Sequence, residues 1–230
     1  MSLAPPEAEG PLRRERLRTA RLYLCCEARP HGEDPEPLLA AALRGGVDIV
    51  QLREKSLPRR EIELAAQTFR RLCDNHSALF IVNDDPDLAR ACDADGVHLG
   101  QDDMSVAEAR ALLGPDAIVG LSTHSKEQIA ASGDAGASPD YISVGPIWET
   151  PTKQGRPAVG LELVSHAAAS APHPFFAIGG IDSSNVSAVT EAGARRLCVV
   201  RAIRDAENPT AAAEELRAAF APLGEEAPGG

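Results

Sequence analysis

A short polar segment, Gln51 to Lys55, closes an apolar run and carries an amide and two cations. Side chains of a strand alternate between its faces, so Gln51, Arg53 and Lys55 share one side, while Val50 and Leu52 take the other. If the strand belongs to a barrel, the polar row lies at the mouth of that barrel. Burying such groups is costly without a partner, so the segment predicts a site for an anion such as phosphate.

Two aspartates, Asp84 and Asp103, follow neighbouring strands of the predicted sheet. Adjacent strands lie about 4.8 Å apart, so carboxylates at their ends can share one hard cation. Mg²⁺ is usually held by one or two protein carboxylates, with water and phosphate completing an octahedron. The alternative for either residue is that it caps the helix that follows, as aspartate often does. With the cationic row nearby we favour a Mg²⁺ site, and we expect Asp85 and Asp102 to be cap or solvent residues.

A loop dense in glycine, proline and threonine runs over residues 145–155. It is long for a barrel loop, and such loops can close over a substrate. Thr150 and Thr152 offer hydroxyls and Lys153 a mobile ammonium, although a solvated surface loop is the alternative. Further along, Gly180 ends a Gly-Gly pair in the place where many barrels bind phosphate through backbone N–H groups.

Eight short apolar runs alternate with eight helical patterns along the chain. The strands are expected at residues 21–26, 49–53, 79–83, 96–99, 118–122, 141–144, 175–178 and 197–201. The helices are expected at residues 35–44, 59–75, 86–92, 106–113, 126–133, 161–170, 184–192 and 210–220. Continuous apolar runs are typical of parallel strands covered on both faces. Eight such units in about 200 residues predict a (β/α)8 TIM barrel, whereas a doubly wound sheet usually has a glycine-rich turn after its first strand.

The polar motifs obey the rule that the chemistry of such barrels lies at the carboxyl ends of the strands. They follow most of the predicted strands, which is hard to explain by chance. The histidines indicate less: we expect His98 to be a packed barrel residue, and His124 either to orient a ligand or to begin a helix. The chain shows no Ser-His-Asp order or Cys-His pairing that would favour covalent catalysis.

Composition narrows the class of protein further. The chain has 230 residues and a formal net charge of −11, which argues against nucleic acid as a partner. Five cysteines without a C-x-x-C pair are typical of reduced, packed thiols, so a cytoplasmic location is expected. No apolar run is long enough to predict a membrane span. We expect one catalytic barrel over residues 20–222, a mobile extension over 1–19 and a tail over 223–230.

Seven segments together resemble the thiamine-phosphate synthase family, whose members join the pyrimidine and thiazole halves of thiamin. They span residues 51–55, 82–84, 96–103, 120–124, 145–153, 178–181 and 199–203. The segments cover about residues 20–205 in the right order and are highly specific as a set. The resemblance implies a transferase with Mg²⁺ as cofactor and two small-molecule substrates, and it leaves open a homo-oligomer.

The resemblance also implies roles for particular residues. The pyrimidine diphosphate would contact Gln51, Leu52, Arg53, Glu54, Lys55, Asn83, Ser122 and Lys153. The thiazole phosphate would contact Thr150, Pro151, Thr152, Gly180, Val200 and Arg201. Mg²⁺ would be held by Asp84 and Asp103, and the catalytic residues would be Arg53, Lys55, Ser122 and Lys153.

The implied reaction is attack of the thiazole nitrogen on the pyrimidine methylene, with loss of pyrophosphate. An electron-rich aminopyrimidine can support a carbocation, so we expect a dissociative step that needs no nucleophile and no strong base. The protein then has to neutralise the leaving diphosphate and hold the thiazole in line.

Two alternatives stay open at this point. One is an isomerase of the same barrel superfamily that aromatises the thiazole phosphate, which has no need for the paired Asp84 and Asp103. The other is a non-catalytic sensor of a phosphate ligand, which would need neither Mg²⁺ nor a closing loop.

Overall fold

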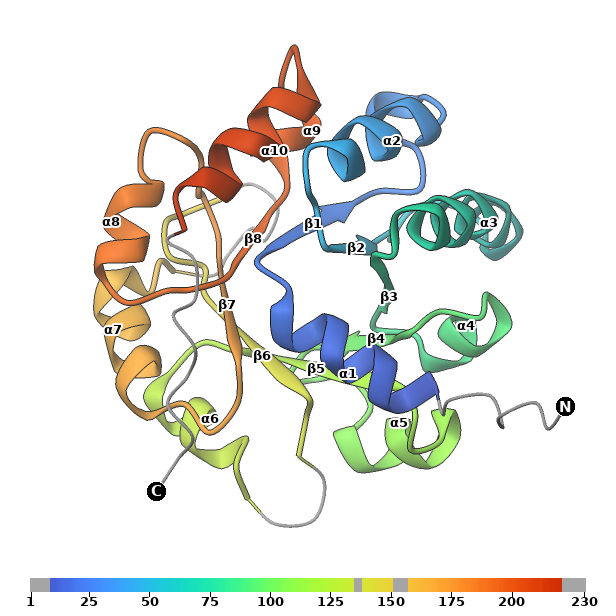
Figure 1. The fold of residues 1–230 in the computed structure, drawn as a ribbon. Coiled ribbons are helices and arrows are strands. Elements are labelled where there is room, and N and C mark those ends of the chain that lie inside the picture. Colours follow the sequence, from blue (N-terminus) through green and yellow to red (C-terminus); the bar gives the residue numbers. More distant parts are fainter. Residues whose placement is uncertain (1–8, 135–137, 151–156, 221–230) are drawn as a thin grey trace, which may run out of the picture.

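The computed structural model describes residues 9–134, 138–150 and 157–220, and within them eight parallel strands close into one barrel in chain order (Figure 1). The strands are β1 (Leu22–Cys26), β2 (Ile49–Leu52), β3 (Leu79–Asn83), β4 (Gly96–Leu99), β5 (Ile118–Thr123), β6 (Tyr141–Val144), β7 (Phe175–Ile178) and β8 (Leu197–Val199). Each strand lies within two residues of its expected ends. The prediction of a (β/α)8 barrel is confirmed.

Helices surround the barrel on its outer face. They are α2 (Glu36–Arg44), α3 (Arg59–His76), α4 (Pro86–Ala91), α5 (Val106–Leu113), α6 (Lys126–Ala131), α7 (Gly160–Ser170), α8 (Val186–Glu191) and α10 (Pro209–Ala218). Three further elements were not expected: α1 (Glu9–Thr19), the short 3-10 helix η1 (Pro30–Gly32) and α9 (Arg201–Arg204).

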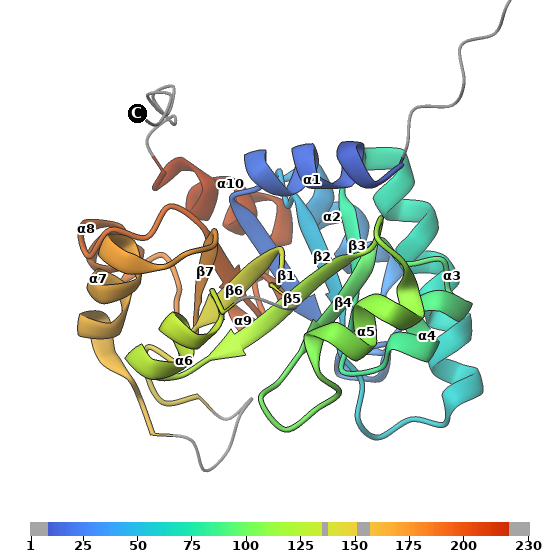
Figure 2. The same ribbon diagram turned by 90° about the horizontal axis from the view of Figure 1, so that it is seen from below.

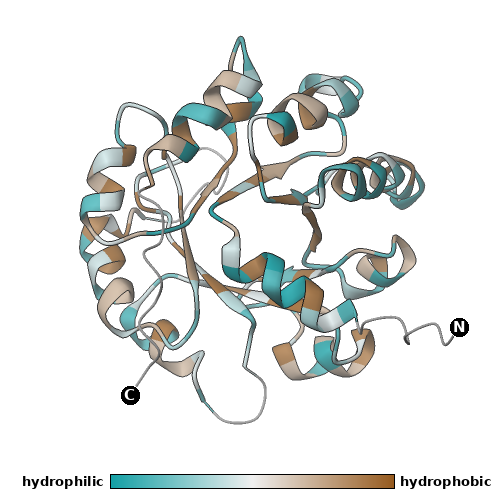
Figure 3. Ribbon diagram, viewed as in Figure 1, coloured by the Kyte–Doolittle hydropathy of each residue, from teal (hydrophilic) through white to brown (hydrophobic). Residues whose placement is uncertain are grey.

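Two hydrophobic cores result from the alternation of side chains along the strands. The larger core lies between the sheet and the helices, and the apolar stripes of the helices face it (Figure 3). The smaller core fills the barrel interior and includes Tyr23, Ile49, Ile81, Tyr141 and Phe176. Every strand is buried on both faces along most of its length, which explains why the strands read as continuous apolar runs.

Helix α1 crosses the amino-terminal end of the barrel, opposite the loops that follow the strands (Figure 2). Leu17 is buried against the inner core, and Arg13 donates to Asp95 at 2.9 Å. The expectation of a mobile extension over residues 1–19 is therefore wrong for residues 9–19. Residues 9–19 contain one buried leucine among mostly polar residues, so the sequence shows no apolar periodicity that would predict a helix there. Residues 1–8 and the expected tail over 223–230 lie outside the described residues.

At the same end of the barrel, three aspartates make the same kind of contact. Asp48, Asp95 and Asp140 each directly precede an even-numbered strand, and each accepts a hydrogen bond from a backbone N–H of the strand before it. Each also pairs with at least one arginine, as Asp95 does with Arg13 and Arg70 at 2.9 and 3.0 Å. These aspartates set the starting register of the sheet at the end away from the predicted chemistry.

Candidate active site

A cavity of about 260 Å³ opens at the carboxyl ends of the strands. Seven of the predicted substrate residues line it: Gln51, Arg53, Asn83, Thr150, Gly180, Val200 and Arg201. They come from four strand ends and the loop after β6, so the fold gathers residues that are far apart in sequence. The cavity reaches into the barrel as far as Tyr23 and Cys25.

Four other predicted residues do not line the cavity, namely Leu52, Glu54, Lys55 and Ser122. Leu52 is 1% exposed and packs in the outer core, as its alternation with Gln51 requires. Ser122 is buried beneath the cavity wall, where its Oγ lies 3.0 Å from Nε2 of His98. Lys55 is exposed and reaches sideways along the rim. The side chain of Leu52 therefore supports the barrel wall.

Glu54 organises the turn after β2. Its Oε1 accepts hydrogen bonds from the backbone N–H groups of Lys55 and Ser56, both at 2.9 Å, and from the hydroxyl of Ser56 at 2.7 Å. Burial acts to raise the pKa of Glu54, but these bonds and one from the backbone of Ala28 outweigh burial and lower that pKa. An ionised Glu54 thus holds the segment that carries Arg53 and Lys55.

Pro151, Thr152 and Lys153 lie outside the described residues, so their predicted roles stay predictions.

The two predicted metal ligands do not cap helices. Helix α4 is capped by Asp85, whose side chain accepts from the N–H of Leu88 at 2.8 Å. Helix α5 begins with a capping box made by Ser105 and Glu108. The alternative that Asp84 and Asp103 serve as caps is therefore wrong, and both carboxylates are left for another task. The expectation that Asp85 is a cap residue is confirmed.

Asp84 faces a cation and a second carboxylate at once. Its Oδ2 lies 3.3 Å from Nζ of Lys55, and its carboxyl lies within hydrogen-bond reach of Asp103. Burial raises the pKa of Asp84, and the neighbouring Asp103 raises it further, although Lys55 acts in the opposite direction. Asp103 is held in turn by the backbone N–H of Gly100, which donates to Oδ2 at 2.7 Å.

This pair fits a magnesium ion by the chemistry of its donors. A buried carboxylate whose pKa is raised by a second carboxylate, as that of Asp84 is by Asp103, gains from a divalent cation between the two, and all the donors are oxygens. Among the described residues no group of three or more His, Cys, Asp or Glu side chains gathers as a metal cluster. The donor set therefore suits a cation that completes its shell with water and phosphate oxygens.

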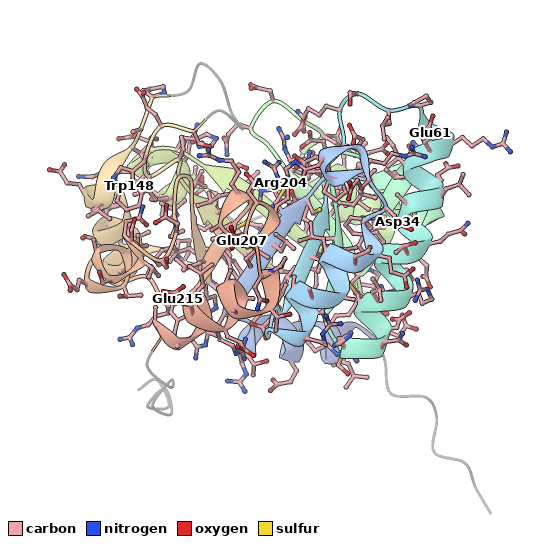
Figure 4. All side chains as sticks on the ribbon, turned by 90° about the horizontal axis from the view of Figure 1, so that it is seen from above. Asp34, Glu61, Trp148, Arg204, Glu207 and Glu215 are labelled. Carbon is pink, nitrogen blue, oxygen red and sulfur yellow. The ribbon has the colours of Figure 1, made fainter. Side chains whose placement is uncertain are left out.

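The Gly-Gly turn after β7 forms one wall of the cavity. Gly179 and Gly180 have φ of 108° and 69°, a region that favours glycine. A Cβ on Gly180 would lie 2.9 Å from Cβ of Trp148, and the N–H of Trp148 donates to the carbonyl of Gly179 at 3.1 Å. Figure 4 shows Trp148 toward the rim, on the loop that follows β6. Both glycines are thus required by the close packing of this loop on the turn.

Helix α9 follows β8 directly at the rim. Val200 precedes its first turn, and Val200, Arg201 and Ala202 line the cavity. The first N–H groups of a helix have no acceptor within the helix, so a helix start is suited to an anion. At the end of α9, Arg204 pairs with Glu27 after β1, and Figure 4 shows Arg204 near the rim. The expected turn at Val200 and Arg201 is therefore a short helix.

Sequence reasoning missed part of the cavity lining. Tyr23, Cys25, His98 and Ser143 line it without having been expected there, whereas His124, which also lines it, was one of the expected ligand-orienting residues. Strand alternation was the available signal, because Tyr23 and Cys25 share the inner face of β1, and Ser143 interrupts the apolar residues of β6. Ser125 is the N-cap of α6, so His124 lies just before the helix start, where its backbone N–H donates to Oε1 of Gln128 at 2.7 Å.

Together these features define a class of protein: a (β/α)8 barrel with a cavity lined by Arg53 and Arg201, and a carboxylate pair, at the carboxyl ends of its strands. The chain belongs to the thiamine monophosphate synthase family, because the model of that family matches residues 22–203.

Individual relatives agree with this family. The chain is 52% identical to the thiamine-phosphate synthase of Thermobifida fusca over 205 residues, which cover 89% of this chain and 94% of the relative. It is 49% identical to that of Mycobacterium tuberculosis over 216 residues, with 89% and 96% covered. Among solved structures, thiamine phosphate pyrophosphorylase from Pyrococcus furiosus is similar at a TM-score of 0.78 and 35% identity, covering 88% of this chain and 96% of that one.

Proposed function

We propose that the protein is a transferase that moves the 4-amino-2-methyl-5-pyrimidinylmethyl group from its diphosphate to a thiazole phosphate, giving thiamin phosphate and pyrophosphate. The observation that carries the proposal is the cavity lined by Gln51 and Arg53 from the end of β2 and by Gly180 and Arg201 after β7 and β8, beside Asp84. A transfer between two phosphorylated substrates needs anion sites at both ends of one cavity.

The diphosphate end is built from cations on the segment after β2. Arg53 lines the cavity, and Lys55 extends along the rim to Asp84. We assign these two side chains the task of neutralising the charge that develops on the departing diphosphate. Gln51 and Asn83 line the same side and would hold the pyrimidine portion of the substrate.

Asp84 and Asp103 would hold Mg²⁺. When bound, the ion supplies positive charge to the diphosphate oxygens and so makes the diphosphate a better leaving group. Asp84 approaches from the end of β3 with its backbone in a left-handed conformation, φ 63°, which directs it to the rim instead of the helix cap. Lys55, at 3.3 Å, balances the charge of Asp84 on the outer side.

The thiazole end is built from backbone groups. Gly180 and the start of α9 face the cavity and would receive the phosphate of the thiazole substrate. Thr150 lines the cavity from the loop after β6. The protein's contribution at this end is to place the thiazole nitrogen in line with the breaking bond, which reduces the entropic cost of the encounter.

The paired carboxylates favour this transferase over the two alternatives. An isomerase acting on the thiazole phosphate alone would have no use for the arrangement of Lys55, Asp84 and Asp103. A sensor without catalysis would not need cations arranged against a leaving group. The five free cysteines support a cytoplasmic location. Among the described residues, no helix is both long and apolar enough to span a membrane.

The test supplies the purified protein with the pyrimidine diphosphate, the thiazole phosphate and Mg²⁺, and measures thiamin phosphate and pyrophosphate together. The two products are expected in equal amounts, and both should disappear when Mg²⁺ is chelated. Binding of both substrates without formation of either product would contradict the proposal. The substitution Asp84→Asn should abolish turnover and leave the fold intact, which a near-native circular dichroism spectrum would establish.

A further inference from the structure

A chain of buried hydrogen bonds crosses the barrel beneath the cavity. Nε2 of Gln51 lies 2.6 Å from the hydroxyl of Tyr23, which lies 3.0 Å from the hydroxyl of Tyr141. That hydroxyl lies 3.1 Å from Nδ1 of His98, and Nε2 of His98 lies 3.0 Å from Oγ of Ser122. The chain thus joins a side chain on β2 to one on β5, three strands away in the closed barrel.

The protons along this chain have one consistent order. The thiol of Cys25 donates to Oε1 of Gln51 at 3.3 Å, which leaves the NH₂ group of the amide facing Tyr23. A phenol has a single proton, and a buried donor without an acceptor is costly. All donors find acceptors when Tyr23 donates to Tyr141 and Tyr141 donates to Nδ1 of His98. Nε2 of His98 then carries the proton and donates to Ser122.

The surrounding structure is shaped to hold these rings. The rings of His98 and Tyr141 stack with centroids 5.5 Å apart and planes 28° apart. Gly120 makes room for them, since a Cβ there would lie 2.2 Å from the ring of Tyr141 and 2.6 Å from Nδ1 of His98. Phe176 packs edge-on against both phenols, at 5.4 Å from each. The chain is therefore a built feature of the barrel interior.

We propose that Tyr23, Tyr141 and His98 are positioning residues that hold the Gln51 amide in one orientation, and so make the cavity prefer an aminopyrimidine over its hydroxypyrimidine counterpart. Gln51 keeps one further N–H and one further carbonyl lone pair, and it lines the cavity. A flip of the Gln51 amide would exchange the positions of its NH₂ group and its carbonyl oxygen, so a ligand in the cavity would meet an acceptor in place of a donor and the reverse. Such a flip would also require every proton in the chain to reverse.

The inference rests on the proposed function, because an aminopyrimidine is the ligand that the amide would read. An amino group donates where a hydroxypyrimidine in its oxo form accepts, so a fixed amide distinguishes the two. Burial raises the pKa of Tyr23 and of Tyr141 well above ordinary values. Both phenols thus keep the protons that the order requires throughout the working range of pH.

The first measurement reads the proton order directly and needs no activity. Nitrogen-15 spectra of the histidine rings at about pH 8, where an ordinary imidazole is neutral, report which nitrogen of each ring carries its proton. The His98 ring can be assigned through its contact with the Tyr141 ring. We expect the Nε2–H tautomer in the wild-type protein. The Nδ1–H tautomer in the wild-type protein would overturn the proposal.

The second measurement compares binding of the aminopyrimidine diphosphate and its hydroxypyrimidine analogue by calorimetry, without the thiazole phosphate. In Tyr141→Phe the preference for the amino compound should fall by roughly tenfold, the contribution of about one hydrogen bond. Tyr23→Phe should have the same effect, which covers the case that one variant fails to fold. A wild-type preference retained in both variants would overturn the proposal.

Phe176→Leu is the matched control. Phe176 is fully buried against the same two phenols but carries no polar group. The Phe176→Leu variant should have a lower melting temperature but keep both the His98 tautomer and the preference for the aminopyrimidine. Loss of the preference in this variant too would mean that packing, not proton order, sets specificity. Failure of the wild-type protein to form thiamin phosphate would instead contradict the proposed function, since the tautomer is read without catalysis.

Discussion

The carboxyl groups of Asp84 and Asp103 lie within hydrogen-bond reach of each other, and neither caps a helix. Two carboxylates in contact repel when both are ionised, so a protein free of metal is less stable for having them. The neighbours Asp85 and Ser105 have taken over the capping that would otherwise explain these residues. The relationship therefore predicts a conflict between stability and function at this point of the rim.

Asp84→Asn tests that conflict through stability. Burial and Asp103 raise the pKa of Asp84 in the folded state, so the free energy of unfolding falls as pH rises through that pKa. At neutral pH the ionised group thus destabilises the folded protein. Asparagine tolerates the left-handed backbone at φ 63° and removes the charge. In a chelator at pH 7 the variant should melt roughly 1–3 °C above the wild-type protein.

Addition of Mg²⁺ should reverse this ranking, because the wild-type protein gains stability from binding the ion and Asp84→Asn does not. Differential scanning calorimetry with and without Mg²⁺ measures both effects. A lower melting temperature of the variant in chelator, or equal responses to Mg²⁺, would contradict the assignment.

Lys55→Gln tests the charge clamp. Lys55 is 62% exposed and pairs with Asp84, so its loss should change the free energy of unfolding by less than about 0.5 kcal/mol. Turnover should fall by about a hundredfold or more, as when one group that stabilises developing charge is removed.

Arg59→Gln is a matched comparison for Lys55. Arg59 is also exposed, and it pairs with Glu63 and with Asp85, the residue next to the proposed metal ligand Asp84. Its loss should leave turnover close to that of the wild-type protein. Steady-state rates with both substrates saturating separate the two variants, and equal losses would indicate a general effect of rim charge.

The strand order and the rim residues were open to prediction from the sequence for a physical reason. In a closed parallel barrel every strand is buried on both faces, and the carboxyl ends all meet at one rim. Polar residues such as Gln51 and Asn83 can therefore be recognised in the sequence, because they stand at the ends of apolar runs. Once the barrel topology is predicted, it follows that these residues meet at one cavity.

The floor of the cavity was harder to predict. Tyr23, Cys25 and His98 lie inside strands, where a polar tip reads as part of an apolar run, and their partners are separated from them by long stretches of sequence. Helix α1 was missed because its stability comes from ion pairs and one buried leucine rather than from an apolar stripe. Such contacts exist only after the chain has folded.

Gly180→Ala tests the phosphate end. Alanine at φ 69° is strained, and its Cβ would lie 2.9 Å from Cβ of Trp148. The free energy of unfolding should fall by about 1–2 kcal/mol, and the KM for the thiazole phosphate should rise more than the KM for the pyrimidine diphosphate. Gly114→Ala provides the comparison, since Gly114 has φ 86° but no atom within 4 Å of the added Cβ. That variant should lose stability alone, and a similar rise in KM from it would remove Gly180 from the site.

Asp95→Asn tests the anchoring of α1 across the base of the barrel. Asp95 is 4% exposed and accepts from the N–H of Phe80 at 2.8 Å while pairing with Arg13 and Arg70. Asparagine keeps one acceptor but removes the buried carboxylate that Arg13 and Arg70 share, which leaves them only their exposed partners Glu9 and Asp74. The free energy of unfolding should therefore fall by about 3 kcal/mol.

Asp87→Asn is the control for Asp95, because Asp87 pairs with Arg90 at the surface, where both side chains are 60% exposed. Its effect should stay within about 0.5 kcal/mol. Urea unfolding at pH 7 measures both variants. Because Asp95 lies at the end of the barrel opposite the cavity, Asp95→Asn should keep the wild-type KM for both substrates at temperatures where it is folded. Equal stabilities of the two variants would show that Asp95 does not anchor α1.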